Sequence, residues 1–192
     1  MAVAAGWLGY RQSLPLITAR KASAWNTIAV RELERGDYLR AQDLLKKSLL
    51  ASPRRADTWH NYGRLLAALN EPDRACAEVH SWTLSRDPVQ ARRALAASLE
   101  DAQPDLAMRF APAMQEAHAN DAAVWHLCAI AAAMSGDPRQ AADWFTVARR
   151  LEPGDRPIQL SEATFRAAGG DAAREAEGRA FLQSLANDPQ LG

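Results

Sequence analysis

Apolar residues along the chain recur at the spacing of one helix face. A small alanine is followed four residues later by a larger apolar residue in three pairs: Ala41 and Leu45, Ala75 and Val79, and Ala141 and Phe145. Residues four apart lie on the same face of a helix, so each alanine lets a neighbouring helix approach closely. No stretch alternates apolar and polar residues as a half-buried strand would. The pattern predicts an all-α fold of amphipathic helices.

Residues that end helices recur at a nearly constant interval. They are Gly36, Asn70, Gln103, Gly136 and Gly170. Gly and Asn can close a helix in the left-handed conformation. A residue typical of a helix start follows each stop, since Asp caps a helix and Pro suits its first position. These starts are Asp37, Pro72-Asp73, Pro104-Asp105, Asp137-Pro138 and Asp171. The alternation predicts one helix–turn–helix unit, repeated along the chain.

These signals divide the chain into helices and repeats. Helices are predicted over residues 22–35, 38–51, 55–69, 73–86, 89–101, 105–118, 121–135, 138–151, 156–168 and 172–186. They pair into repeats over residues 22–55, 56–88, 89–121, 122–155 and 156–188 of one repeat domain, 22–188. Residues 1–21 form a separate segment, either a short helix from about Leu14 to Ala19 that covers the first repeat or the trimmed end of a membrane anchor.

The repeats resemble the tetratricopeptide repeat, whose pattern has Trp, small residues and Tyr in the first helix, Ala and Phe in the second, and a closing Pro. The second repeat follows this pattern with Trp59, Tyr62-Gly63, Ala75, Val79, Trp82 and Pro88. The fourth follows it with Trp125, Cys128-Ala129, Ala141, Phe145, Ala148 and Pro153. The first repeat keeps Trp25, Ala41 and Pro53, whereas the third lacks the Trp and the fifth keeps little beyond Gly170.

The resemblance implies a right-handed α-solenoid whose first helices line a concave inner wall. Residues one, two or about five places after the repeat Trp are expected to face that wall. The wall is then polar and mildly basic over the first three repeats, and apolar over the fourth, at Leu127 and Ile130. Its candidate partner-binding residues are Asn26, His60, Asn61, Arg64, Arg93 and His126. Asn and His can hydrogen-bond a peptide backbone, and Arg can pair with a carboxylate.

The expected function is therefore that of an interaction scaffold or adaptor, with a protein or peptide partner in the groove. The alternative for these side chains is an ordinary solvated face. The Lys–Asn clamp that co-chaperone members use for a C-terminal carboxylate is not expected, because Asn26 and Val30 stand where the first repeat would need Lys and Asn. A second hypothesis is an accessory subunit of a membrane-bound secretion or polysaccharide/glycosylation machine. Self-association through residues 1–21 or the last hairpin also stays open.

Charge and composition narrow the class of partner. Lys and Arg number 23, as do Asp and Glu, so the formal net charge is zero. A nucleic-acid binder usually has a basic excess, so no nucleic acid is expected. The two cysteines, Cys76 and Cys128, are interpreted as small apolar helix residues. A reducing, cytoplasmic compartment follows, with a membrane-associated or periplasmic site as the alternative.

Chemistry within the chain is not expected. The four histidines lack the spacing that places two metal ligands on one helix face, and no glycine-rich phosphate loop or Gly-x-Ser-x-Gly elbow occurs. No metal, cofactor or enzyme activity is predicted. The remaining enzymatic hypothesis is an acid–base pair of His60 and His126, with Asp57 and Arg64 nearby. Trp144 is expected to be buried beside Phe145 rather than exposed at a contact surface.

Overall fold

The computed structural model describes the backbone of residues 2–169 and 172–186, and the side-chain surroundings of residues 18–169 and 175–184. This part of the chain forms ten α-helices and no strand, which confirms the all-α class. They are α1 (Ala2–Arg35), α2 (Tyr38–Ala51), α3 (Ala56–Ala68), α4 (Arg74–Ser85), α5 (Pro88–Glu100), α6 (Pro104–Ala117), α7 (Ala122–Met134), α8 (Pro138–Leu151), α9 (Arg156–Ala167) and α10 (Ala172–Ala186).

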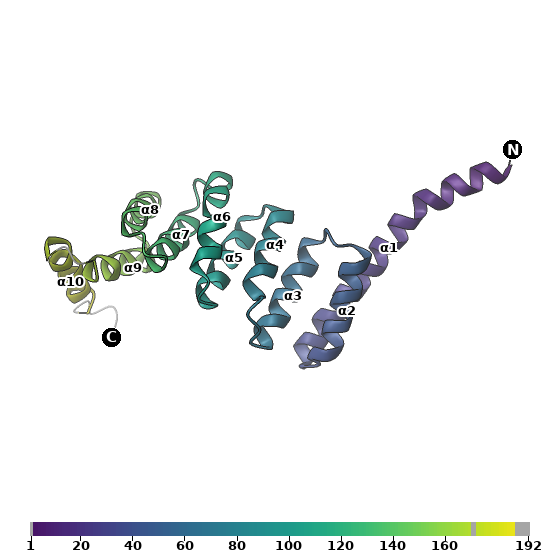
Figure 1. Cartoon of the computed structure of the whole chain (residues 1–192), viewed down its shortest axis with the longest axis horizontal. Helices are drawn as coiled ribbons and strands as arrows, with labels where there is room; N and C mark the ends of the chain where they lie inside the picture. The colour runs from purple at the N-terminus through teal and green to yellow at the C-terminus, as the bar shows by residue number, and fades with distance from the viewer. Residues whose placement is uncertain (1, 170–171, 187–192) are drawn as a thin grey trace. The chain divides into compact units, whose positions relative to one another are not determined.

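From α2 onward, every helix begins and ends within one residue of the predicted bounds. The first helix differs, because α1 begins at Ala2 and continues without a break through Pro15 into the first repeat. In Figure 1, α1 (purple) continues well past the end of α2. No Gly, Asn or Asp stands between Tyr10 and Ala22 to end the helix. A proline removes one backbone hydrogen bond, and here it does not end the helix. The side chain of Trp7 lies outside the described residues.

No helix within the described part of the chain combines the length and apolar character needed to cross a bilayer.

The chain divides into two compact units, residues 1–90 (unit 1) and 91–192 (unit 2), with the division inside α5. In unit 1, α1 pairs with α2 and α3 with α4, while α1 and α2 also pack against α3. In unit 2, α7 pairs with α8 and α9 with α10; α6 packs on α7, and α7 and α8 pack on α9. Each unit is therefore built from helical hairpins joined by short turns.

Left-handed residues end the first helices of the hairpins. Gly36 and Gly136 both have φ of 80°, and Asn70 has φ of 55°. The fourth such residue is Ala102, with φ of 53°, so the predicted stop at Gln103 is one residue too late. Gln103 instead occupies the N-cap position of α6 without a side-chain cap hydrogen bond, and its N–H donates to the Ser98 carbonyl at 2.7 Å. This hydrogen bond closes the turn despite the strain of a left-handed alanine. The predicted stop at Gly170 and start at Asp171 lie outside the described residues.

Aspartates cap several helix starts, as their position in the sequence predicts. Asp37 accepts a hydrogen bond from the Arg40 N–H at 3.1 Å, and Asp137 accepts one from the Gln140 N–H at 3.0 Å. Asp73, in contrast, precedes α4 without a side-chain cap hydrogen bond. The capped ends satisfy amide groups that have no partner within their helix.

Equivalent helices of the two units share a register offset of 100 residues. Helix α2 spans Tyr38–Ala51 and α8 spans Pro138–Leu151. The buried core repeats at the same offset, since Ala41 and Leu45 match Ala141 and Phe145. Trp144 is buried as expected. The two units therefore contain the same hairpin arrangement with different side chains, and their surfaces can be compared position by position.

The repeat tryptophans fasten the first helix of a hairpin to the turn before it. The indole N–H of Trp59 donates to the Pro53 carbonyl at 2.8 Å, and that of Trp125 donates to the Ala119 carbonyl at 2.9 Å. In the last repeat, Gln159 takes the same role, because its amide donates to the Pro153 carbonyl at 2.6 Å. Trp25 differs because the residue six places earlier lies inside α1 rather than in a turn.

Candidate functional site

The six predicted partner-binding residues are distributed over both units. Asn26 on α1 and His60, Asn61 and Arg64 on α3 belong to unit 1. Arg93 on α5 and His126 on α7 belong to unit 2.

In unit 1, two buried asparagines join α1 to α3. The Asn61 amide donates to Asn26 Oδ1 at 3.0 Å. Asn26 in turn donates through Nδ2 to Asp57 Oδ2 at 3.2 Å. Arg55 also donates to the Asp57 carboxylate, through Nε at 3.1 Å and through Nη2. The Asp57 charge is thus balanced by a guanidinium, which lowers the cost of holding it beside buried amides.

Arg64 forms the exposed end of the same network. Its Nη1 donates to Asn61 Oδ1 at 3.4 Å, a long hydrogen bond that leaves most of the guanidinium to solvent. The structure therefore brings together three of the predicted residues, Asn26, Asn61 and Arg64. It adds Asp57, whose place at the start of α3 was noted in the sequence only as a possible neighbour of a catalytic pair.

His60 faces the partner helix of its own hairpin. Its Nδ1 lies 3.0 Å from both carboxylate oxygens of Glu78 on α4, and Glu78 is buried. Gly63 makes room for that carboxylate, because a Cβ at position 63 would lie 2.9 Å from Glu78 Oε1. This arrangement directs the imidazole toward α4 and gives it a structural partner. The nearby ring pair is Trp59 with His80, whose centroids are 4.4 Å apart.

In unit 2, His126 and Arg93 have different surroundings. Arg93 is exposed on α5. His126 is half-buried with its ring 6.0 Å from that of Phe145, and its Nε2 is buried without a hydrogen-bond partner. Burial lowers the pKa of His126 below its ordinary 6.5, and the negative charge of Asp155 partly opposes this shift. His126 is therefore a neutral imidazole at neutral pH, packed at the position that Asn26 holds in unit 1.

Unit 2 has an apolar groove between α7 and α9, bordered by Pro138 and Phe145 of α8, with a volume of about 940 Å³. Its main lining side chains are Ile130, Met134, Phe145, Leu160, Thr164 and Phe165. Met134 is 49% exposed and Leu160 is 48% exposed, although both are large apolar residues. The groove lies on first helices of hairpins, where the sequence predicts the inner wall, and Ile130 is one of the two residues that predicted its apolar part.

None of the twelve residues that line the apolar groove is charged. The corresponding positions in unit 1, 100 residues earlier, carry His60 in place of Leu160 and Arg64 in place of Thr164. Glu34 likewise stands in place of Met134. The two units thus present opposite chemistry at equivalent positions, a polar network in unit 1 and an uncharged hollow in unit 2.

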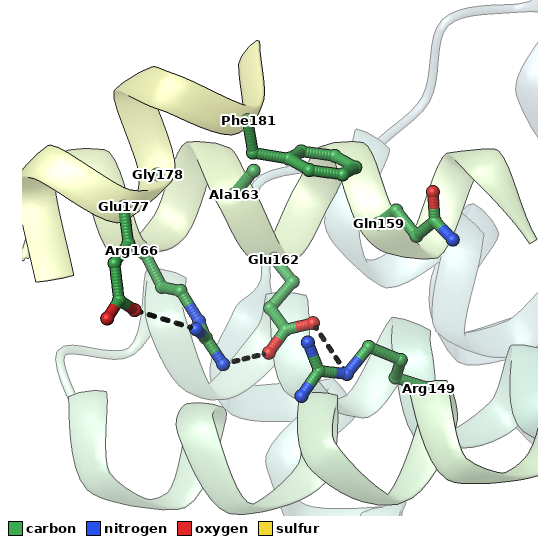
Figure 2. Close-up of a pocket in the computed structure, with 8 residues that line it drawn as sticks. All are labelled: Arg149, Gln159, Glu162, Ala163, Arg166, Glu177, Gly178 and Phe181. Atoms are coloured by element: carbon green, nitrogen blue, oxygen red, sulfur yellow. Dashed lines mark hydrogen bonds and ion pairs between the residues drawn. The ribbon is translucent and has the colours of Figure 1, made fainter. Parts of the chain in front are cut away.

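A second cavity in unit 2, of about 260 Å³, lies between α8, α9 and α10. Figure 2 shows a row of charged side chains along it: Glu177, Arg166, Glu162 and Arg149. The buried Glu162 accepts from Arg166 at 2.6 Å and lies 3.5 Å from Arg149 Nε, while Arg166 reaches Glu177 at 3.4 Å. Two guanidinium groups balance two carboxylates, so this row joins three helices and leaves no net charge for a ligand.

No cluster of His, Cys, Asp and Glu side chains suited to a metal ion occurs in the described part of the chain. Cys76 is exposed and Cys128 is buried, and both are free thiols. Burial raises the pKa of Cys128 to about 12, and a hydrogen bond with Gln115 partly offsets the shift. Cys128 is therefore a protonated, inert core thiol at neutral pH.

Sequence reasoning missed the residues that form most of the apolar groove. Leu160 and Phe165 were not singled out, because the fifth repeat matches the repeat pattern poorly and its first helix has no tryptophan to set the register. Met134 was not singled out because it is the last residue of its helix, beyond the positions that the repeat Trp predicts to face the wall. A usable signal was present in the 100-residue offset, which aligns Leu160 with His60 and Met134 with Glu34. Glu78 was missed as well, and its signal is the glycine that faces it, Gly63.

The chain was compared with known families, curated proteins and solved structures. No protein-family model matches it, and no curated protein matches it. Solved structures do match. MamA from Desulfovibrio magneticus RS-1 has a TM-score of 0.68 at 20% identity, covering 88% of this chain and 97% of that one.

Two further structures have similar scores. YrrB, described as a TPR protein with an unusual peptide-binding site, has a TM-score of 0.65 at 14% identity, covering 87% of each chain. PilW, described as a widely conserved type IV pilus biogenesis factor, has a TM-score of 0.61 at 20% identity, covering 85% of this chain and 77% of that one. The chain therefore has the tetratricopeptide-repeat fold, an α-solenoid of helical hairpins, as the residue pattern predicts.

Proposed function

We propose that the chain is a non-enzymatic interaction scaffold that binds partner proteins or peptides on the first helices of its hairpins. The observation that carries this proposal is the apolar groove, where Met134 and Leu160 are both about half exposed above a lining without charge. Soluble proteins expose single apolar side chains commonly, but a hollow lined by them is typical of a binding site. Binding a partner there removes this surface from water.

The polar network of unit 1 supports a second contact surface on the same chain. Arg64 is exposed and makes one long hydrogen bond, so its guanidinium keeps donors for a partner carboxylate. Asn61 accepts this hydrogen bond and is itself held by a hydrogen bond to Asn26. A charged contact of this kind contributes to the choice of partner.

The two free thiols, Cys76 and Cys128, support a reducing compartment, and we place the scaffold in the cytoplasm. The printed description of PilW as a pilus biogenesis factor supports the alternative of an accessory role in a membrane-bound assembly. Fractionation of cells that express the tagged chain distinguishes the two, because an accessory subunit is recovered with membranes.

Affinity capture from native lysate tests the scaffold proposal. The wild type is compared with Leu160→Glu in the apolar groove, Arg64→Glu in unit 1, and the control Leu39→Glu on α2, where Leu39 is 84% exposed. Each variant is first checked for unchanged helical content by circular dichroism. We expect the first two variants to lose captured proteins that the wild type and the control retain. An identical set of captured proteins for all four chains contradicts the proposal.

A further inference from the structure

The apolar groove of unit 2 offers almost no hydrogen-bond donors to an occupant. Ser161 and Thr164 carry the two side-chain hydroxyls of its lining, and the Thr164 hydroxyl already donates to the Leu160 carbonyl at 2.8 Å. The backbone N–H groups at its turn ends are also used, since Gly136 donates to Ala133 and Gly169 donates to Arg166. One hydroxyl, that of Ser161, remains as a donor.

The scarcity of hydrogen-bond donors in the groove favours one backbone conformation of a bound ligand over another. An extended peptide would find one side-chain donor, the Ser161 hydroxyl, and each of its carbonyl groups that turned toward the apolar lining would exchange a water partner for none. Each buried polar group without a partner costs about 1–3 kcal/mol. A helix satisfies its own backbone hydrogen bonds and presents only side chains, so it enters an apolar groove without this cost.

The uncharged lining decides which helix face can enter. A Lys or Glu side chain placed against Ile130, Met134 or Leu160 would lose part of its hydration and meet no opposite charge in this lining. Unit 1 differs at the equivalent positions, where the exposed Arg64 and Glu34 are able to pair with a charged partner. The occupant of the groove must therefore turn an uncharged, apolar face toward α7 and α9.

From these observations we infer that the apolar groove is a receptor for an amphipathic α-helix of a partner protein, with its leucine-like side chains seated between Met134 and Leu160. This inference rests on the proposed scaffold function and names the partner structure that it recognises. An extended peptide and a second copy of this chain are the other outcomes that the experiment resolves.

The probe is a synthetic peptide of about 18 residues with leucines at helical i, i+3, i+4 and i+7 spacing and an uncharged face around them. Its twin keeps every leucine and replaces two central polar residues with proline, which prevents the helix. Binding is followed in the full chain by NMR of methyl-labelled methionines. The Met134 methyl reports on the groove and is assigned with Met134→Leu, while the buried Met114 reports on the fold.

We expect the helical peptide to shift the Met134 signal and leave the Met114 signal unchanged. The proline twin should bind at least about tenfold more weakly than the helical peptide. Leu160→Glu should weaken binding of the helical peptide by a similar factor, and Leu39→Glu should not. Equal binding of the twin overturns the inference in favour of an extended ligand. A Met134 signal that depends on protein concentration without peptide favours a second copy, and no Met134 shift at millimolar peptide also overturns it.

Lysate capture distinguishes failure of the helix inference from failure of the scaffold proposal. If Leu160→Glu removes captured proteins while the helical peptide does not bind, the scaffold stands and the helix inference falls. If Leu160→Glu changes neither the captured proteins nor the binding of the helical peptide, the groove is not a binding site and both proposals are wrong.

Discussion

The hydroxyl of Ser48 lies 3.2 Å from that of Thr58, deep in the core of unit 1, and it also donates to the Ala22 carbonyl at 2.8 Å. The equivalent residues of unit 2 are the apolar trio Ala148, Ile158 and Ala122, which form a buried cluster. The same contact between three helices is thus made by hydrogen bonds in one unit and by apolar packing in the other.

The first prediction concerns replacement of the hydrogen-bonded contact of unit 1 by the apolar contact of unit 2. Ser48→Ala removes both hydrogen bonds and leaves the buried Thr58 hydroxyl without this partner, so we expect a loss of about 1–3 kcal/mol in the free energy of unfolding. The double variant Ser48→Ala with Thr58→Ile reproduces the unit 2 pair and should recover much of that loss. Urea unfolding followed by circular dichroism measures both, and a double variant less stable than the single one contradicts the interpretation.

His126 makes the stability of unit 2 depend on pH. Burial lowers its pKa in the folded chain below the 6.5 of an unfolded histidine. The unfolded state therefore binds the proton more readily, so this contribution is complete above pH 6.5 and is lost as the pH falls toward the folded pKa. We expect the wild type to lose more stability between pH 7.5 and pH 5.5 than His126→Asn, which carries the unit 1 residue. If the free energy of unfolding, measured in urea, falls equally with pH for the two chains, His126 does not cause the pH dependence.

The two cysteines should react at very different rates. Cys76 is exposed, whereas burial raises the pKa of Cys128 from an ordinary 9.0 to about 12. The shift alone reduces the thiolate of Cys128 by about a thousandfold, and burial restricts access further. Mass spectrometry after brief iodoacetamide treatment at pH 8 should find one modified cysteine, and two after denaturation. Cys76→Ser is the matched control and should remain unmodified while folded.

Gly178 allows α10 to lie directly on α9. A Cβ at this position would lie 2.6 Å from the Ala163 carbonyl oxygen and 2.7 Å from the Ala167 nitrogen, which are backbone atoms. Gly178→Ala must therefore push the helices apart, and we expect a cost of about 1–3 kcal/mol within the last hairpin. We expect this loss of stability to appear as faster amide hydrogen exchange in α9 and α10, with little change in the exchange rates of unit 1.

Two other glycines serve as controls for this clash. Gly154→Ala should be nearly neutral, because nothing lies within 4 Å of its added Cβ. Gly63→Ala should cost less than Gly178→Ala, since its Cβ meets the side chain of Glu78 rather than backbone, but it should displace that buried carboxylate from His60. If Gly178→Ala exchanges no faster than Gly154→Ala, the close approach of α9 and α10 is not a constraint.

The positions of the helices could be predicted from local residues because helix ends are local chemistry. Gly36 and Gly136 end helices by adopting a left-handed backbone, and Asp37 and Asp137 begin the next helices by capping amides a few residues ahead. The turn after α5 is an exception, and it has a physical cause. Ala102 takes the left-handed conformation that alanine normally avoids, since the hydrogen bond of the Gln103 N–H holds the turn.

The candidate site depended on which side chains the packed helices bring together. The residue pattern placed Asn26, Asn61 and Arg64 on first helices. The hydrogen bond of Asn61 to Asn26 joins α3 to α1 across 35 residues of chain, and Arg64 bonds to Asn61 within α3. The pattern assigned His60 to the same surface and did not predict its contact with Glu78, for which Gly63 leaves space within the hairpin. Such pairings depend on distances between helices, which residue spacing within one helix does not contain.

By itself, the sequence determined the helices, their turns and the repeat fold, since capping, helix propensity and apolar spacing act within a few residues. The tertiary structure alone decided where the surface is hollow. Met134 and Leu160 belong to different hairpins, and only the packing of α7 against α9 makes them two sides of one uncharged groove. Whether an apolar residue is buried or remains exposed for a partner depends on the helix beside it, not on its own spacing along the chain.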